Sequence, residues 1–402
     1  MRRMRILHTS DWHLGRTLHG VDLLGHQADF LDHLVAVVRE RGVDAVLVAG
    51  DVYDRAIPPV EAVRMLSDVL RRLAEVTQVV LTPGNHDSAT RLGFGAELMR
   101  DGLHVRASLA DVGAPVVLHE RDGRAGAYVY ALPYLDPDDA RHRLAQPGEE
   151  PLARSHEAVT AAATARVRAD LAGRRAADDV RVPAVLVAHT FVVGGEASES
   201  ERDIRVGGVD NVPSGVLRGA DYVALGHLHG PQRVPVADGP DGARTVARYS
   251  GSPLAYSFSE KDHRKSTVLV ELGPDGVVGE PELLPAPVPR RLADVRGTFE
   301  EVTGALGAAH ADDWVRVTVT DAQRPEHLVA RVKDVMPHAL VVVHEPPARD
   351  ASHGPRTVTA ASDPFDVCCG FVEHVRGAAP DDAEQAVLRD ALEAARRAEV
   401  SA

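Results

Sequence analysis

Cysteine, lysine, aromatic residues and long apolar runs are all scarce in this chain of 402 residues. The two cysteines, Cys368 and Cys369, are adjacent and cannot form a disulfide framework, which predicts a reducing, cytoplasmic compartment. No apolar run approaches the roughly 20 residues that cross a bilayer, which excludes a membrane protein. Aromatic residues make up 4% of the chain, too few to predict a platform for stacking single-stranded bases.

The motifs of several enzyme classes are also missing. There is no Gly-x-x-x-x-Gly-Lys-Ser/Thr loop, so we expect no ATP hydrolysis by this chain. A Gly-x-Ser-x-Gly elbow is absent, and neither cysteine lies in the context of a nucleophile. The formal charge of −14 argues against indiscriminate coating of nucleic acid, because such binding depends on neutralising phosphates. It leaves room for a nuclease whose contacts with DNA are local.

Short apolar runs alternate with amphipathic stretches along most of the chain. We predict strands over residues 4–9, 45–49, 79–82, 128–132, 184–188, 223–225, 245–249 and 267–271. We predict helices over residues 22–41, 60–73 and 156–175. Alternation of strands and helices favours a largely parallel α/β sheet.

Four prolines between Pro281 and Pro289 mark the boundary that we expect between domains. Beyond them, a helix over 298–309, a strand over 314–320, a helix over 325–336 and a strand over 339–344 predict a small α+β module. A last helix is predicted over 381–402, with Leu388 and Leu392 four residues apart. We therefore expect domains at 1–285 and 286–375, followed by a tail at 376–402.

Polar residues that suit metal ions follow the predicted strands. They are Asp11, His13, Asp51, Asn85, His189, His227 and His229. The carboxyl ends of strands in an open α/β sheet meet at one edge, so these residues are expected to lie together. Oxygen and nitrogen ligands without thiolate suit Mn²⁺, Fe or Zn²⁺. Seven ligands are too many for one such ion but fit a pair that shares a carboxylate, the arrangement used for attack at phosphorus.

Each cluster alone is weak evidence, because a Gly-Asp pair or a histidine after a strand is usually structural. Most of the chain's 20 histidines lie outside the clusters. The prediction depends on the ordered set, which resembles that of the calcineurin-like metallophosphoesterase superfamily. Longer segments are similar to the bacterial SbcD family of nuclease subunits, namely HTSDWHLGRTLHG, GDVYDRAIPP, TPGNHDS, GHLHGPQ and YSGSPLAYSFSE.

This resemblance implies a sandwich of mixed sheets flanked by helices, with a small α+β capping domain. It implies one metal ion held by Asp11, His13, Asp51 and His229. It implies a second ion held by Asn85, His189 and His227, with Asp51 bridging the two. His86 matches the catalytic histidine of the family, which does not bind metal. Asp87 is expected either to orient the His86 ring or to form a turn, and Asp54 stands where many relatives carry a histidine.

The implied activity is that of a metal-dependent DNA exonuclease and endonuclease, acting on DNA ends and hairpins in repair, recombination and replication. A hydroxide bridging two divalent ions, for which we expect Mn²⁺, would attack the phosphodiester with assistance from His86. The implied partners are DNA, an ATPase of the SbcC type bound to the tail, and a second copy of the chain. Candidate DNA contacts are Arg16, Arg55 and Arg91. The alternatives are a small-molecule phosphodiesterase or phosphatase of the same superfamily and, less favoured, a non-catalytic scaffold.

Overall fold

The chain divides into two units, Met1–Glu345 and Pro346–Ala402. The computed structural model describes residues 3–99, 102–120, 123–202, 204, 211–238, 244–347 and 362–400. Within these ranges, no helix combines the length and the apolar character needed to cross a membrane.

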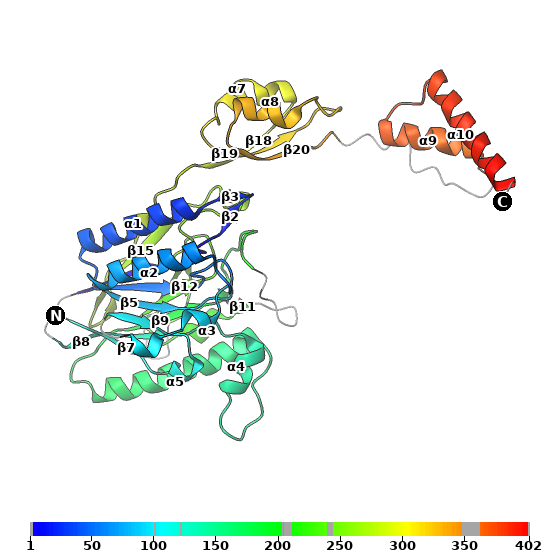
Figure 1. Cartoon of the computed structure of the whole chain (residues 1–402). Helices are drawn as coiled ribbons and strands as arrows, with labels where there is room; N and C mark the ends of the chain where they lie inside the picture. The colour runs from blue at the N-terminus through cyan, green and yellow to red at the C-terminus, as the bar shows by residue number, and fades with distance from the viewer. Residues whose placement is uncertain are drawn as a thin grey trace. The chain divides into compact units, whose positions relative to one another are not determined.

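Two mixed β-sheets form the centre of the first unit (Figure 1). In the first sheet, four strands run parallel: β1 (Met4–Thr9), β4 (Ala45–Ala49), β5 (Gln78–Thr82) and β6 (Leu103–Val105). Beside β1 lies antiparallel β15 (Ser266–Gly273), which also pairs with β16 (Gly276–Val277) and β17 (Glu282–Pro285).

The second sheet repeats this plan. Its parallel strands are β8 (Ala125–Ala131), β9 (Ala184–His189), β12 (Tyr222–Gly226) and β14 (Val246–Tyr249). Its antiparallel edges are β7 (Val116–His119) and β13 (Gln232–Val234). Short pairs complete the strands, β2 (Thr17–Leu18) with β3 (Val21–Asp22) and β10 (Phe191–Val192) with β11 (Asn211–Val212). The single largely parallel sheet suggested by the alternation is therefore two sheets, and the sandwich of mixed sheets is confirmed.

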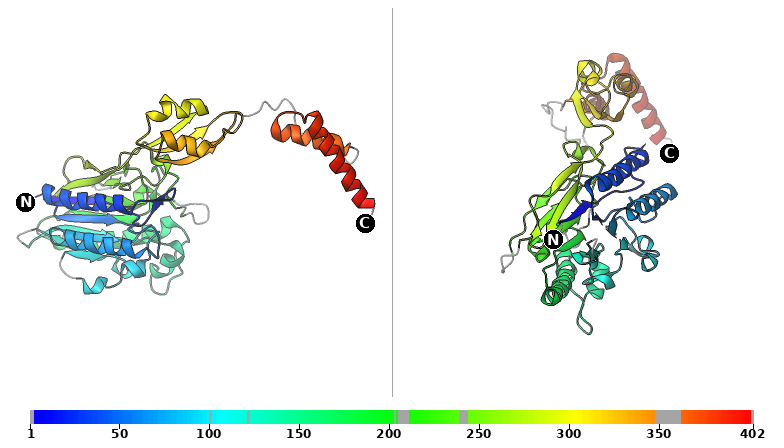
Figure 2. Two further views of the ribbon diagram at one scale, coloured as in Figure 1. Left: turned by 45° about the horizontal axis from the view of Figure 1, so that its top comes forward. Right: turned by 90° about the vertical axis from the view of Figure 1, so that its left-hand side faces the viewer.

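Helices cover the outer faces of the sandwich. In Figure 2, α1 (Leu24–Arg41) and α2 (Val60–Ala74) lie side by side on the first sheet. The second sheet packs against α4 (Pro137–Arg143) and α5 (His156–Ala177). Successive residues of β4 face opposite sides of the sheet. Val46 and Val48 share a core with α1, whereas Leu47 packs with Val185 of the second sheet. Burial of both faces explains the unbroken apolar run of this strand.

The remaining short helices of the main body border the sheets. They are α3 (Ala89–Leu92) and the 3₁₀ turns η1 (Ala96–Leu98), η2 (Leu109–Asp111), η3 (Ser214–Leu217) and η4 (Phe258–Glu260).

A small module follows the sandwich within the first unit. Its three parallel strands are β18 (Leu292–Gly297), β19 (Trp314–Val319) and β20 (Ala339–His344), joined through α6 (Phe299–Thr303), α7 (Ala305–Ala308) and α8 (Leu328–Val335). The predicted helix over 298–309 is broken at Gly304, whose φ of −98° and ψ of −143° leave the helical region. Trp314 packs with Leu18 and Leu254 of the main body, and Lys261 bonds Asp294 at 2.7 Å.

The second unit contains α9 (Pro364–Arg376) and α10 (Asp382–Val400). The sequence predicts α10 but not α9, which begins with an Asp363 cap and proline at its first position and ends at Gly377 in the left-handed region. Cys368 and Cys369 lie on α9 as free thiols. No residue of α9 is buried.

Candidate metal centre

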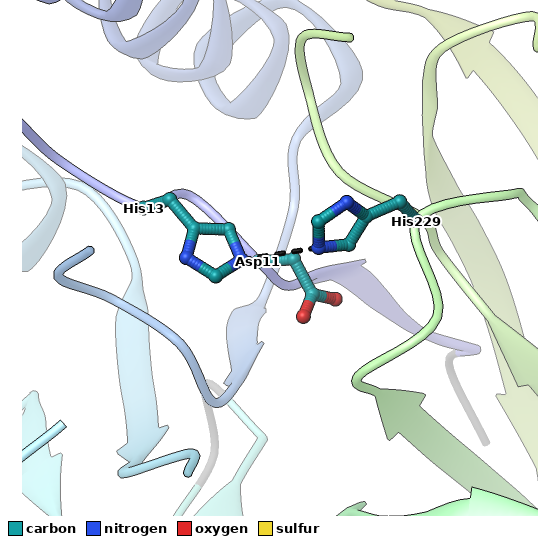
Figure 3. A group of neighbouring side chains, drawn as sticks. All are labelled: Asp11, His13 and His229. Atoms are coloured by element: carbon teal, nitrogen blue, oxygen red, sulfur yellow. Dashed lines mark hydrogen bonds between the residues drawn. The ribbon is translucent and has the colours of Figure 1, made fainter. Parts of the chain in front are cut away.

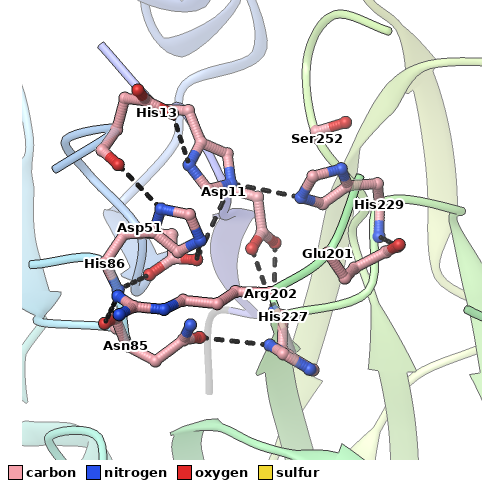
Figure 4. A network of polar contacts seen from close by, with 12 residues as sticks. Asp11, His13, Asp51, Asn85, His86, Glu201, Arg202, His227, His229 and Ser252 are labelled. Carbon is pink, nitrogen blue, oxygen red and sulfur yellow. Dashed lines mark hydrogen bonds and ion pairs between the residues drawn. The ribbon is translucent and has the colours of Figure 1, made fainter. Parts of the chain in front are cut away.

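All seven predicted ligands meet where strands of both sheets end, and Figure 4 labels all of them except His189. Asp11 and His13 follow β1, Asp51 follows β4, and Asn85 follows β5. From the second sheet, His189 ends β9, while His227 and His229 follow β12. The backbone joins the first loops, because Asp11 N donates to Gly50 O at 3.0 Å and His13 N donates to Asp51 O at 2.9 Å.

Backbone strain is concentrated at these ligands. Asp11, His13, Asp51 and His227 have φ values of 54°, 45°, 49° and 106°. Across the described ranges, the only other non-glycine residues with positive φ are His19 and His327. A positive φ is costly for residues with a side chain and occurs mainly where the surrounding structure enforces it, as at functional sites.

The two ligand edges approach so closely that only glycine fits between them. A Cβ on Gly226 would lie 1.8 Å from Ala49 O, and a Cβ on Gly84 would lie 2.2 Å from Asp51 Oδ1. Both distances are far inside van der Waals contact. Gly226 therefore sets how closely the two sheets approach at the ligands, and Gly84 sets how closely the loop after β5 approaches Asp51 within the first sheet.

The first set of ligands is Asp11, His13 and His229 (Figure 3). The Nε2 atoms of the two histidines lie 3.1 Å apart, and all three side chains are buried. Burial drives the pKa of His13 well below its ordinary value, so its ring is neutral. Two buried imidazoles whose Nε2 atoms face each other beside a carboxylate fit a cation between them.

The second set of ligands gathers around Asn85. Its Oδ1 lies 2.9 Å from His189 Nε2 and 3.2 Å from His227 Nδ1. Nδ1 of His189 donates to Ala49 O at 2.9 Å, which fixes the ring with Nε2 toward the site. Burial lowers the pKa of His189, but the Asp51 carboxylate overcomes this and raises it to about 9. Burial holds the pKa of His227 well below its ordinary value.

Asp51 lies between the two sets. Its Oδ2 is 3.6 Å from His13 Nε2 and 3.4 Å from His189 Nε2. Burial acts to raise the pKa of Asp51, but the charge of His189 prevails and holds the pKa well below its usual range. An ionised carboxylate flanked by nitrogen and oxygen donors, without thiolate, fits a pair of divalent cations.

His86 lies beside Asp51 but outside both sets. Its backbone N donates to Asp51 Oδ1 at 2.9 Å, and its Nδ1 donates to Asp54 O at 2.7 Å. Its Nε2 therefore points toward the centre, 4.0 Å from Asp51 Oδ2. Asp54 also groups with His13 and His86 in space, with its Oδ1 4.0 Å from His13 Nδ1.

Asp87 bonds to the backbone of the ligand loops. Its carboxylate accepts hydrogen bonds from the N atoms of Val52, Tyr53 and Gly84 at 3.0, 2.9 and 2.9 Å. Burial raises the pKa of Asp87 to about 7, although these three donors oppose the rise. The hydrogen-bond partner of the His86 ring is Asp54 O, and Asp87 instead joins the loops that carry Asp51 and Asn85.

The three arginines predicted to contact DNA differ in their burial and in their hydrogen-bond partners. Arg16 is largely buried, donates to Ser200 O at 2.7 Å and stacks on the Tyr256 ring. Arg91 donates to Ala56 O at 2.9 Å. Arg55 is exposed, with Asp54 3.5 Å away.

Several residues of the centre are not predicted from the sequence. Glu201 accepts a hydrogen bond from His229 N at 2.8 Å, and Arg202 donates to Asn85 O at 3.4 Å. Figure 4 shows both beside the predicted ligands. Glu260 and Lys265 form a buried ion pair next to His229. The only sequence signal was that Glu260 ends the quoted segment YSGSPLAYSFSE.

Comparisons with known proteins agree with this geometry. Residues 4–231 match the family described as Calcineurin-like phosphoesterase, and residues 288–375 match that described as Type 5 capsule protein repressor C-terminal domain. The chain is 39% identical over 279 residues to the SbcD subunit of the nuclease SbcCD from Bacillus subtilis (strain 168), covering 67% of each.

Solved structures with some similarity include a dimetal phosphatase from Danio rerio, at 14% identity and a TM-score of 0.41, covering 71% of this chain and 99% of that one. A protein of Thermus thermophilus matches at 16% identity and a TM-score of 0.38, covering 70% of this chain and 99% of that one.

Proposed function

The chain belongs to the calcineurin-like phosphoesterase family, in the branch of the SbcD nuclease subunits, and on this premise we propose how its residues cleave DNA. The family identifies it as a metal-dependent nuclease. We assign Asp11, His13 and His229 to one divalent ion. Asn85, His189 and His227 are assigned to the second, with Asp51 shared.

The position of Asp51 carries this assignment. Its Oδ2 lies within 3.6 Å of a histidine nitrogen from each set, as expected of a carboxylate shared by two ions. When bound, two such ions supply Lewis acidity that lowers the pKa of an attacking water and neutralises charge on the phosphate. Mn²⁺ suits the mixed oxygen and nitrogen ligands, and we propose it as the metal.

His86 is proposed to handle the proton of the leaving group. Because Nδ1 already donates to Asp54 O, the proton available for transfer is the one at Nε2. From Nε2, which lies 4.0 Å from Asp51 Oδ2, the ring can donate a proton to the leaving 3′ oxygen. Asp87 supports the same loops through the backbone amides that it binds.

We propose that the substrates are DNA ends and hairpins, cleaved by exonuclease and endonuclease action in repair, recombination and replication. Arg55 is proposed to reach flanking phosphates, because its side chain is exposed. Arg16 and Arg91 are proposed to position the loops that border the substrate, since each bonds a backbone carbonyl there. With two adjacent cysteines as its only thiols, the chain fits a reducing cytoplasm.

The proposed domain plan assigns residues 1–285 to catalysis, 286–375 to a cap, and 376–402 to a tail that binds an ATPase of the SbcC type. The tail's helix α10 pairs with α9, in which every residue retains some exposure. We also propose a homodimer. Exposed apolar side chains on α2 and after α3 support it, because Phe94 and Leu98 are 86% and 83% exposed.

Cleavage of three substrates by the full chain with Mn²⁺ tests this function. Linear duplex DNA, a DNA hairpin and a chromogenic phosphodiester are compared in parallel, with and without the ATPase. We expect metal-dependent cleavage of both DNAs. Strong hydrolysis of the small ester with DNA left intact would instead favour a small-molecule phosphodiesterase. Metal binding with no cleavage of any substrate would indicate a scaffold.

A further inference from the structure

Glu260 is a buried carboxylate that contacts the proposed ligand His229 but has no part in the function described above. It is fully buried at the end of η4. Its Oε1 lies 3.3 Å from His229 Nδ1 and accepts a hydrogen bond from Tyr256 N at 3.1 Å. An ionised carboxylate this deep in the fold requires compensation.

Lys265 provides the compensating charge. Its buried Nζ donates to the Glu260 carboxylate, to His229 O at 2.9 Å and to Ser252 Oγ at 2.9 Å. A lysine ammonium has three donors, and each of them has an acceptor here. Lys265 therefore fixes both Glu260 and the backbone of His229.

The hydroxyl of Ser200 links Glu260 to the His229 ring. It donates its proton to the Glu260 carboxylate, and its oxygen lies 2.7 Å from His229 Nδ1. Because that single proton is used, the hydroxyl accepts from Nδ1, which must carry the ring proton. The unprotonated nitrogen of His229 is then Nε2, the atom that faces His13 Nε2 at 3.1 Å.

We propose that Glu260 is a positioning residue that holds His229 in the tautomer and orientation needed to bind the first metal ion, with Ser200 as intermediary and Lys265 as counter-ion. The inference rests on the proposed function, which makes His229 a ligand. Carboxylates that accept the second N–H of a ligating histidine fix its ring and raise its basicity. His13 has no such support, because its buried Nδ1 lacks a hydrogen-bond partner among the described residues.

Mn²⁺ binding to the metal-free full chain tests the proposal, measured by calorimetry and by electron paramagnetic resonance. Wild type is expected to bind two ions and to show the signal of a coupled pair. In Glu260→Gln, an amide NH₂ must face either Lys265 or the Ser200–His229 pair, so one acceptor is lost. We expect one of the two sites to weaken by about 10- to 100-fold while the other is unchanged, leaving a signal of isolated Mn²⁺.

Asp221→Asn is the matched control. Asp221 is also a buried carboxylate with cationic partners, since it lies 3.2 Å from Arg175 Nη2 and bonds Arg181. It precedes β12, whereas His227 and His229 follow the other end of that strand. This variant should lower the melting temperature and leave both Mn²⁺ affinities as in wild type. The control separates general destabilisation from an effect on His229.

Ser200→Ala provides a second measurement if Glu260→Gln does not fold, because it removes the linking hydroxyl without leaving a buried charge unpaired. It is expected to weaken the same site by about 10-fold, at the low end of the range for such residues. Wild-type affinity at both sites in a folded Glu260→Gln or Ser200→Ala protein overturns the inference and leaves the proposed function intact. Failure of wild type itself to bind two ions contradicts the proposed function instead.

Discussion

At the scale of single residues, His189 and His86 share one pattern of hydrogen bonds but differ in how close Nε2 lies to the metal-competent atoms. Nδ1 of His189 donates to Ala49 O and Nδ1 of His86 donates to Asp54 O, so both rings turn Nε2 toward Asp51. His189 Nε2 also lies 2.9 Å from Asn85 Oδ1, among other metal-competent atoms. His86 Nε2 is 4.0 Å from the shared carboxylate and suits proton transfer.

Replacing His86 with alanine separates the two roles. We expect Mn²⁺-dependent DNA cleavage to fall by about 10²- to 10⁴-fold, the usual contribution of a positioned acid or base. Calorimetry should still detect two bound ions, because His86 belongs to neither ligand set. His142→Ala, at an exposed position of α4, should retain wild-type activity. Undiminished cleavage by the His86 variant would remove this residue from the mechanism.

The proposed ligands could be predicted from the sequence because each follows a strand closely. Asp11, Asp51 and Asn85 come within three residues of β1, β4 and β5, where strand order alone brings them together. Ser200, Arg202 and Glu260 could not be found this way. They reach the centre through the packing of long loops, which has no periodicity in the sequence.

At the scale of elements, His8 joins β1 of the first sheet to β12 of the second. Its Nε2 lies 3.2 Å from Leu225 O, which can only accept, so Nε2 carries the ring proton. Its Nδ1 then accepts from the Tyr222 hydroxyl at 3.0 Å. Protonation of Nδ1 would break this bond within the core. Burial lowers the pKa of His8 to about 3, from 6.5.

This depressed pKa predicts a loss of stability in mild acid. Between pH 6.5 and about 3 the unfolded chain binds a proton at His8 that the folded chain excludes. The free energy of unfolding therefore decreases as the pH is lowered through this range. At pH 5 the loss from this residue is about 2 kcal/mol, at 1.36 kcal/mol per pH unit.

Urea denaturation of wild type and His8→Gln, at pH 7 and pH 5 in metal-free buffer, measures the contribution of His8 to the free energy of unfolding. Glutamine lacks the titration, so the stability advantage of wild type should shrink by about 2 kcal/mol at the lower pH. His142→Gln, exposed on α4, is the control and should show the same difference from wild type at both values. A pH-independent difference for His8→Gln would show that His8 titrates normally.

Helices with strong apolar periodicity and strands with buried apolar runs can be predicted from the sequence. Helices whose bounds depend on a local interruption of the backbone are harder to predict. The run Ala45–Ala49 appears as β4 with the predicted bounds. The predicted helix over 298–309 is interrupted because Gly304 leaves the helical region, and a Cβ on Gly307 would lie 1.9 Å from Val302 O. Helix α9 was not predicted, since Cys368, Cys369 and Gly370 obscure its apolar spacing.

At the scale of the whole molecule, exposed apolar side chains indicate surfaces that other chains cover. Ile57 and Val60, near the start of α2, are 69% and 59% exposed. Arg91 on α3 donates to Ala56 O, which brings this segment close to the one that carries Phe94. These residues form the surface on which we propose the homodimer.

The double variant Phe94→Asp/Leu98→Asp tests that surface. Buried carboxylates would be costly in a dimer interface, so sedimentation should show a monomer where wild type shows a dimer. Hydrolysis of the small phosphodiester should be unchanged. Val180→Asp, which places a charge at another exposed apolar position, should sediment like wild type. A dimer that survives the double variant would locate the interface elsewhere.

The second unit lacks a buried apolar core of its own in the described residues. Phe371 and Val387 are each 67% exposed, and the Arg389 guanidinium stacks on the Phe365 ring, 4.7 Å from its centroid. Two helices that leave such side chains in water gain stability when a partner buries them. We propose that the ATPase of the SbcC type docks on the tail's helix α10, with the adjoining α9 extending the same surface.

Truncation after Pro380 removes α10 and tests the docking segment. A co-expressed ATPase of the SbcC type should purify with the full chain and not with the truncated one, because α10 supplies Val387 and the cover for α9. The truncated protein should keep its Mn²⁺-dependent hydrolysis of the small phosphodiester, since all seven proposed ligands lie in the first unit. Equal recovery of the ATPase with both chains would move the docking site out of α10.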